Sequence, residues 1–318
     1  MTSSDLLDVV IVGGGPAGLS AALNLGRARK RVALLDAGTP RNARAHGIHG
    51  FVTRDGTPPA EFRRIAREQL AKYPNVEIHD AWVESVSRDG EVFSVVAGAR
   101  NLEARRLLLA VGMIDELPDT PGYRELWGRS IFQCPFCHGW ELIEDPRGGR
   151  TALGVLATHP MMIEFAFMLS GWSRDLVVFL GEGIPITDEQ RARLAAARIT
   201  LEERPIHALE AEGGELARVV LEGGERVRRQ ALFARPVQRQ VALVSSLGLA
   251  LDEMGFVKVD EHRKTSVAGI SAAGDLTTMR QGAVIAAAEG AMAGIMLVHE
   301  LTADGLQQES LARATPPA

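Results

Sequence analysis

The chain contains two cysteines, and both lie three residues apart in the segment FQCPFCHGWEL, residues 132–142. A pair this close can alternate between a dithiol and a disulfide. Pro135 fits the first turn of a helix that begins after Cys134, and a thiol at a helix N-terminus has a stabilised thiolate. His138 follows Cys137, and its ordinary pKa of about 6.5 suits proton transfer to and from thiols near pH 7. We therefore expect Cys134, Cys137 and His138 to be catalytic residues of a redox site.

A redox pair needs a source or a sink of electrons, and the N-terminal residues predict one. An apolar run at residues 9–12 leads into GGGPAG at residues 13–18, then into a helical pattern and a second apolar run that ends in Asp36. Strand, glycine turn, helix, strand and acid in this order indicate a Rossmann-type dinucleotide site. Gly13 permits the tight turn, and Gly15 lets a pyrophosphate approach the N–H groups at the helix start.

Two later segments extend this pattern. Residues 269–275 read GISAAGD and precede a polar turn and a long Ala-rich run that opens at Gln281-Gly282, while residues 107–112 read LLLAVG. A helix N-terminus aimed at the flavin pyrimidine would stabilise the anionic reduced ring. Each segment alone also fits a buried strand with a tight turn. Their occurrence in this order favours FAD as the dinucleotide.

With FAD motifs at both ends and a CxxC between them, the chain resembles the low-molecular-weight thioredoxin reductases over nearly its whole length. The resemblance implies an α/β fold with two Rossmann-like dinucleotide-binding domains. It places the FAD domain in residues 1–117 and 242–318, and an inserted NAD(P)H-type domain, which carries the cysteines, in residues 118–241. It implies FAD binding by Gly13, Gly15, Pro16, Ala17, Asp36, Arg41, His46, Val83, Ala110, Gly112, Gly274, Asp275, Gln281 and Gly282.

The inserted domain departs from the pattern of an NADPH site at two places. In the family, a glycine turn follows the first strand of this domain and arginines follow the next. Here residues 156–160 read LATHP, and residues 181–183 read GEG. Side chains and a proline in the first turn obstruct a pyrophosphate, and Glu182 repels a 2′-phosphate. We therefore expect a degenerate NAD(P)H-type domain that has lost nucleotide binding.

The CPFCHG sequence at residues 134–139 and residues 41–56 are similar to the flavin-dependent dithiol oxidases that close disulfides in natural products such as holomycin and gliotoxin. This likeness implies oxidation of a small dithiol, with O2 as acceptor and H2O2 as product. By family position, Cys137 faces the flavin and Cys134 meets the substrate. Glu141 is a candidate to orient His138, although a solvated helix-end carboxylate fits equally well.

Three alternatives stay open at this point. One is a thioredoxin or small-disulfide reductase fed by NADPH through an unusual site, and another is the same reductase fed by a protein such as ferredoxin. The third is a non-catalytic flavin redox sensor that binds a partner. The sequence does not identify the thiol substrate or the physiological electron acceptor. His46 and His49 are candidates to line the flavin or substrate side, although such residues beside glycines are as often turn residues.

Composition narrows the function classes further. Hydrophobic content of 46%, charged content of 24% and a net charge of −5 describe a soluble protein and argue against nucleic-acid binding. The apolar stretch 282–301 is Ala/Gly-rich and contains Glu289, so we expect a buried helix and no membrane span. The N-terminus lacks a basic region typical of a signal peptide, and a close cysteine pair without one favours the cytoplasm. The cysteines and histidines lack metal-ligand spacing. A homodimer is implied by the resemblance alone.

Overall fold

The computed structural model describes residues 6–143 and 151–314. Their contacts divide into two compact units. The first unit takes in the described residues of Met1–Ala43, Thr57–Ile114 and Gln238–Ala318, and the second those of Arg44–Gly56 and Asp115–Val237. The two crossing segments, β7 (Ile114–Glu116) and β16 (Val237–Arg239), pair with each other. The segment 44–56 thus groups with the cysteine-bearing unit, whereas the sequence placed it in the FAD domain. The domain boundaries drawn from the sequence stay a prediction.

A sheet of seven strands organises the described part of the first unit, with β3-β2-β1-β6-β5-β4 in that order and β17 paired to β6. The strands are β1 (Leu7–Val12), β2 (Val32–Asp36), β3 (Val76–Asp80), β4 (Ser85–Asp89), β5 (Val92–Ala97), β6 (Arg100–Leu109) and β17 (Ile270–Ala272). β1, β2, β3, β6 and β17 run parallel, and β5 is antiparallel to both of its neighbours, β6 and β4. Parallel strands covered on both faces are apolar throughout, which explains the unbroken run in β1.

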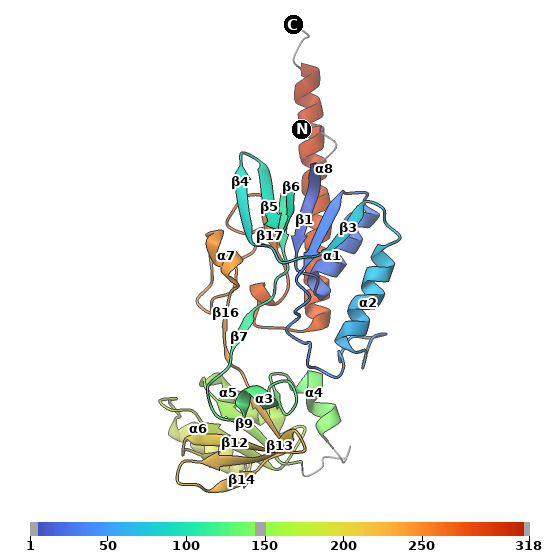
Figure 1. The fold of residues 1–318 in the computed structure, drawn as a ribbon. Helices are drawn as coiled ribbons and strands as arrows, with labels where there is room; N and C mark the ends of the chain where they lie inside the picture. Colours follow the sequence, from blue (N-terminus) through green and yellow to red (C-terminus); the bar gives the residue numbers. More distant parts are fainter. Residues whose placement is uncertain (1–5, 144–150, 315–318) are drawn as a thin grey trace. The chain divides into compact units, whose positions relative to one another are not determined.

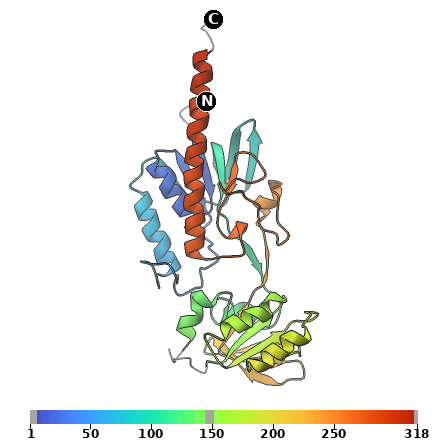
Figure 2. The same ribbon diagram turned by 180° about the vertical axis from the view of Figure 1, so that it is seen from behind.

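Three helices cover one face of this sheet, and the short helix α7 (Ala242–Ser246) with the irregular segment that follows it covers the other. The helices of the unit are α1 (Pro16–Arg27), α2 (Pro59–Leu70), α7, the 3-10 helix η1 (Asp275–Thr277) and α8 (Ala283–Ala314). Figures 1 and 2 show α1, α2 and α8 on the same side of the sheet. Alternate residues of β1 divide between the faces: Val9 and Ile11 pack toward α1 and α8, and Val10 packs toward Val244 and Phe256.

The long helix α8 is apolar because it packs against α1. A Cβ on Gly290 would lie 1.9 Å from the carbonyl oxygen of Ala17, so the two backbones approach closely there. Within the described residues, one segment, Ala283–Gln307, is long and apolar enough to cross a membrane by length and composition alone. Core helices of soluble proteins pass the same test. Ala293 and Leu297 are buried in the core shared with α1, whereas Ile285, Met292 and Ile295 are exposed, so the helix that the sequence led us to expect as buried is buried on one face.

The second unit contains a parallel sheet in the order β11-β10-β9-β15-β8 and an antiparallel sheet in the order β12-β13-β14. The strands are β8 (Ile131–Phe132), β9 (Leu153–Ala157), β10 (Leu176–Leu180), β11 (Thr200–Glu202), β12 (Ile206–Glu212), β13 (Glu215–Leu221), β14 (Arg226–Arg228) and β15 (Ala231–Ala234). The helices are α3 (Tyr123–Leu126), α4 (Pro135–Leu142), α5 (Met161–Leu169) and α6 (Asp188–Ala196). The succession β9-α5-β10-α6-β11 with parallel neighbours is a Rossmann-type arrangement.

Candidate active site

The cysteine pair lies at the start of α4, as the sequence predicts. Cys134 is the extended N-cap residue, Pro135 occupies the first helical turn, and the Cys137 N–H donates to the Cys134 carbonyl oxygen over 3.2 Å. The two residues are not joined by a disulfide, and the Cys137 thiol donates a hydrogen bond to the Cys134 sulfur over 2.7 Å. One turn of helix therefore brings the two sulfurs together at its N-terminal end.

This geometry explains why the Cys134 thiol is more acidic than an ordinary cysteine. The hydrogen bond from Cys137 lowers the pKa of Cys134 to about 7 against the opposing effect of burial. The backbone N–H groups of Cys137 and Phe136 and the charge of Arg235 act in the same direction as that bond. A large share of Cys134 is therefore thiolate at neutral pH, which makes it a good nucleophile and a good leaving group in thiol exchange.

His138 lies one turn inside α4 and is stacked on Phe132, with ring centroids 4.2 Å apart and an interplanar angle of 18°. Both of its ring nitrogens are buried and make no hydrogen bond with any described residue. Burial is the largest effect on the pKa of His138 and lowers it, and the charges of His49 and His46 lower it further. The Cys134 backbone and the charge of Glu141 act in the opposite direction. The imidazole is therefore mostly neutral near pH 7, and its buried nitrogens have no hydrogen bond that a thiol proton would have to replace.

Glu141 does not orient His138 in this structure. Its carboxylate lies 3.4 Å from Nδ1 of His49, which also faces Asp55 at 3.6 Å. Glu141 is thus a partner of the loop that carries His49. The influence of Glu141 on His138 is electrostatic, through its effect on the pKa of the imidazole.

Trp172 packs against α4 at Gly139 and Phe136. A Cβ on Gly139 would lie 2.6 Å from the Trp172 indole nitrogen, so the HG pair after the second cysteine lets the helix pack closely. Phe136 meets Trp172 edge-on, with centroids 5.2 Å apart. Phe136 and Trp140 otherwise face solvent, with 68% and 72% of their surface exposed. The helix therefore presents aromatic rings beside its two sulfurs.

The glycine turn after β1 fits a pyrophosphate. A Cβ on Gly13 would lie 2.3 Å from the Ala110 carbonyl oxygen, and Gly13 has a φ of +109°. A Cβ on Gly15 would meet no protein atom within 4 Å, so this backbone faces open space. No side chain caps α1, and its first turn carries no acidic residue. The N–H groups at its start are free for phosphate oxygens.

Asp36 ends β2 beside this turn and is 6% exposed. Its carboxylate accepts hydrogen bonds from the Gly38 N–H at 3.0 Å, from Arg67 at 3.1 Å and from Arg63. Burial opposes ionisation of Asp36, but these donors outweigh it and lower the pKa. The carboxylate is therefore ionised and lies against Gly14, at the position expected for an acceptor of ribose hydroxyls.

The second motif is held by a network that includes Asp275. Arg41 lies 3.1 Å from the Asp275 carboxylate and donates to the Gln281 side-chain oxygen at 2.7 Å. Glu289 is buried, accepts from the Gly274 N–H at 2.8 Å and from the Thr277 hydroxyl at 2.9 Å, and pairs with Arg263 at 3.2 Å.

The predicted FAD residues, His46 excepted, fall in the first unit. Gly13, Asp36, Ala110 and Gly274 follow or end parallel strands and so lie at the carboxyl edge of one sheet, where such folds bind nucleotides. The remaining predicted FAD residues also belong to the first unit: Gly15, Pro16, Ala17, Arg41, Val83, Gly112, Asp275, Gln281 and Gly282. His46 lies in the second unit, and its contact with FAD stays a prediction.

The corresponding turn of the second unit is closed. After β9, Nδ1 of His159 accepts the Met161 N–H at 3.2 Å, and the His159 and Pro160 carbonyls accept the next two N–H groups of α5. The first turn of α5 also carries Glu164. In contrast to α1, the first N–H groups of α5 are already bound within the chain, and Glu164 would repel a phosphate.

The comparisons with known proteins agree with this arrangement. The sequence pattern of the family described as pyridine nucleotide-disulphide oxidoreductase matches residues 7–300. The chain belongs to this family. It is 33% identical to "Thioredoxin reductase sirT" of Leptosphaeria maculans, over 92% of this chain and 94% of that protein, and 33% identical to "Thioredoxin reductase tcpT" of Claviceps purpurea, over 98% and 99%. Its structure is similar to the crystal structure of HlmI, with a TM-score of 0.90, 35% identity and coverage of 99% and 98%.

Family membership confirms several expectations from the sequence. The fold is thioredoxin-reductase-like with Rossmann-type sheets, the protein is an oxidoreductase, and FAD is its cofactor. The open glycine turn, the ionised Asp36 and the uncapped α1 fit that cofactor.

Within residues 6–143 and 151–314, no group of three or more His, Cys, Asp or Glu side chains is placed to hold a metal ion.

Sequence reasoning missed four residues that the structure brings to these sites. Phe132 stacks on His138, and Trp172 packs against Gly139. Glu289 holds the Gly274 turn. Arg129 lines a cavity together with His46. Phe132 directly precedes the CxxC segment, which is a weak signal for its role; the other three act across distances in sequence that no local pattern reveals.

Proposed function

We propose that the protein oxidises a small dithiol to a disulfide, with O2 as the final electron acceptor and H2O2 as the product. The observation that carries this proposal is the closed turn before α5. Its first N–H group is bound by His159, and Leu156, Ala157 and Thr158 stand where a nucleotide site needs glycines. Without a nicotinamide donor, the thiol substrate is the electron source that the proposal assigns to the cysteine pair.

The thiol steps follow from the placement of the two sulfurs. With Cys134 and Cys137 as a disulfide, one substrate thiolate attacks Cys134, the bond between the cysteines breaks, and Cys137 leaves as a thiolate. The second substrate thiolate then attacks the substrate sulfur, so that the substrate leaves as a disulfide and Cys134 becomes a thiolate. The backbone N–H groups of Cys137 and Phe136 and the charge of Arg235 stabilise the Cys134 thiolate, which makes Cys134 a good leaving group in this second step.

His138 handles the protons of these exchanges. A neutral imidazole with two unpartnered buried nitrogens accepts the proton of the attacking substrate thiol and returns it later. FAD bound by the first unit would accept an electron pair from the dithiol and donate it to oxygen. The assignment of Cys137 as the sulfur that faces FAD rests on family position.

The two half-reactions can be tested separately. Purified protein mixed anaerobically with dithiothreitol should show reduction of the flavin absorbance, and air should restore it with one H2O2 per disulfide. Cys134→Ser and Cys137→Ser should both abolish turnover. Fast flavin reduction by NADPH would favour the reductase, and reduction by reduced ferredoxin alone would favour the protein-fed reductase. A slow response to every donor would favour the sensor.

A further inference from the structure

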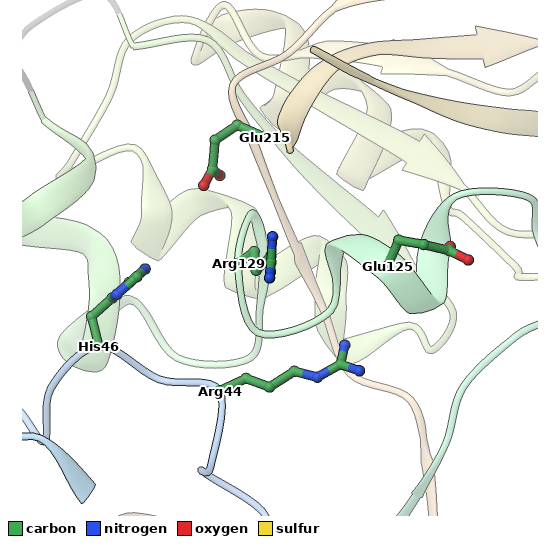
Figure 3. Close-up of a pocket in the computed structure, with 5 residues that line it drawn as sticks. All are labelled: Arg44, His46, Glu125, Arg129 and Glu215. Carbon is green, nitrogen blue, oxygen red and sulfur yellow. The ribbon is translucent and has the colours of Figure 1, made fainter. Parts of the chain in front are cut away.

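The second unit contains a cavity of about 590 Å³ that is lined by Arg44, His46, Glu125, Arg129 and Glu215. All five residues belong to the same unit: Arg44 and His46 come from the segment 44–56, and the others from 115–237. Figure 3 shows the His46 ring, the Arg129 guanidinium and the Glu215 carboxylate around one space, while the Glu125 carboxylate extends away from His46 and Arg129. No role in the thiol chemistry above uses this cavity.

The charged side chains that line the cavity differ in the hydrogen bonds that they make within the protein. Glu215 accepts a hydrogen bond from the Ser130 hydroxyl, and that oxygen accepts the Leu216 N–H at 3.1 Å, so the carboxylate is held in place. Arg44 donates from one nitrogen to the Arg124 carbonyl at 2.9 Å. The Arg129 guanidinium makes no hydrogen bond or ion pair with any residue that the structure describes.

We propose that this cavity binds a free carboxylate of a short peptide-like dithiol substrate, with Arg129 as its principal partner and Arg44 as the second cation. The proposal rests on the proposed function. A guanidinium presents a planar fork of N–H donors that matches both oxygens of a carboxylate. Arg129 is the cation of the cavity whose donors are all available to a ligand.

The charge balance favours a carboxylate over a phosphate. Arg44 and Arg129 line the cavity together with Glu125 and Glu215, so the formal charges of these four side chains cancel. A singly charged carboxylate bound at Arg129 adds less negative charge beside Glu215 than a phosphate does. A doubly charged phosphate would leave excess negative charge next to Glu215, which is unfavourable at short range.

The short chain segment between Arg129 and Cys134 gives an upper limit to the length that the substrate must span. Arg129 precedes Cys134 by five residues, which span at most about 17 Å between Cα atoms when extended. His46, on the cavity wall, is close enough to His138 for its charge to affect the pKa of that imidazole. A peptide-like molecule of about four or five residues covers such a distance, so one ligand can place a thiol at Cys134 and a carboxylate at Arg129.

Steady-state kinetics with matched peptides test the carboxylate. The probes are N-acetylated Cys-Gly-Gly-Cys as its free acid, the same peptide as its C-terminal carboxamide, and dithiothreitol. Arg129→Gln should raise KM for the acid about tenfold or more and leave KM for the other two within about twofold. Arg129→Lys should give an intermediate loss, because the charge remains and the fork is gone. Arg228→Gln, which removes an exposed arginine of β14, is the matched control and should change none of the three.

A binding measurement separates this proposal from the proposed function. The S-methylated forms of the two peptides have no thiol chemistry, and calorimetry should show the acid binding at least about tenfold more tightly than the amide. Arg129→Gln should remove that difference. If the protein binds the free acid more tightly than the amide but oxidises no dithiol, the carboxylate site is supported and the proposed oxidase function is rejected. Equal binding of acid and amide, or an unchanged preference in Arg129→Gln, would overturn the carboxylate site even if dithiols are oxidised.

Discussion

The imidazole of His138 lies flat against the ring of Phe132, with centroids 4.2 Å apart, and neither of its nitrogens has a hydrogen-bond partner among the described residues. Buried polar groups normally find partners, and an exception calls for an explanation. Here the explanation is chemical: a histidine next to Cys137 that is held in position by packing alone keeps both nitrogens available to reacting thiols.

Replacement of Phe132 should change the pKa of His138. Burial is the main cause that lowers this pKa below the ordinary value of about 6.5. NMR titration of the His138 ring, assigned with His138→Gln, should give a midpoint below 6.5 in the wild type. In Phe132→Leu the ring gains solvent and the midpoint should rise. Phe165→Leu, which alters a ring packed on Phe233, is the control and should leave it unchanged. A wild-type midpoint above 6.5 would reject burial as the controlling effect.

Loss of the imidazole should slow catalysis much more than it affects folding. If His138 moves the thiol protons, His138→Ala should lower turnover with dithiothreitol by roughly 10²–10⁴-fold. His49→Ala removes a neighbouring histidine that pairs with Glu141 and should cost far less. Rates measured across pH 6–9 check both variants. A loss below about threefold on the plateau for His138→Ala would return His138 to a structural role.

The sequence predicted local features of this site well because neighbouring residues determine them. The start of α4 at Pro135, the turn at Gly13 and the acid at the end of β2 each depend on a few adjacent residues. The partner of Glu141 depends on where the segment 44–56 folds, and that cannot be inferred from spacing along one helix. The sequence therefore left open whether Glu141 orients His138, and the structure places the Glu141 carboxylate beside His49.

The cavity lined by Arg129 and Glu215 shows more clearly that spacing in the sequence does not reveal contacts between distant segments. Arg129 and Glu215 are far apart in the chain, and they meet because Ser130 and β13 lie side by side. Neither residue belongs to a motif. In the same way, Glu289 was noticed in the sequence as a charge that argues against a membrane span. Its hydrogen bond to Gly274 depends on how α8 lies beneath the turn, which only the packing of α1 against α8 determines.

The hydrogen bond from Cys137 should control the acidity of Cys134. It is the largest cause that lowers the pKa of Cys134 to about 7. In Cys137→Ser the hydroxyl can still donate, whereas in Cys137→Ala no donor remains. The rate of iodoacetamide alkylation against pH should therefore show a midpoint near 7 in the serine variant and a higher one in the alanine variant. Mass spectrometry reads out the reaction, because each variant has one cysteine. Identical midpoints would assign the acidity to the helix N-terminus instead.

Removal of Glu289 should weaken the hold on FAD. Its carboxylate fixes the Gly274 N–H and the Thr277 hydroxyl, and so sets the turn that carries Asp275. Glu289→Ala leaves a buried N–H without an acceptor, which should cost about 1–3 kcal/mol of folding free energy and increase FAD loss on dilution. Glu300→Ala removes another ion-paired acid of α8 away from this turn and is the control. Thermal melts and released flavin fluorescence give the two readouts. FAD retention equal in both variants would contradict a role at the turn.

Nicotinamide nucleotides should fail to bind the second unit. At the start of α1 the helix donors are uncapped and the turn is glycine, whereas at α5 His159 accepts the Met161 N–H and Glu164 adds a negative charge. Calorimetric titration with NADP⁺, NAD⁺ and 2′,5′-ADP should therefore show no saturable binding at concentrations up to about a millimolar. His159→Ala frees one N–H but leaves the side chains of Leu156 and Thr158 in the turn, so it should not create binding on its own. Micromolar binding of NADP⁺ by the wild type would mean that a divergent site works, and it would move the function to an NADPH-fed reductase.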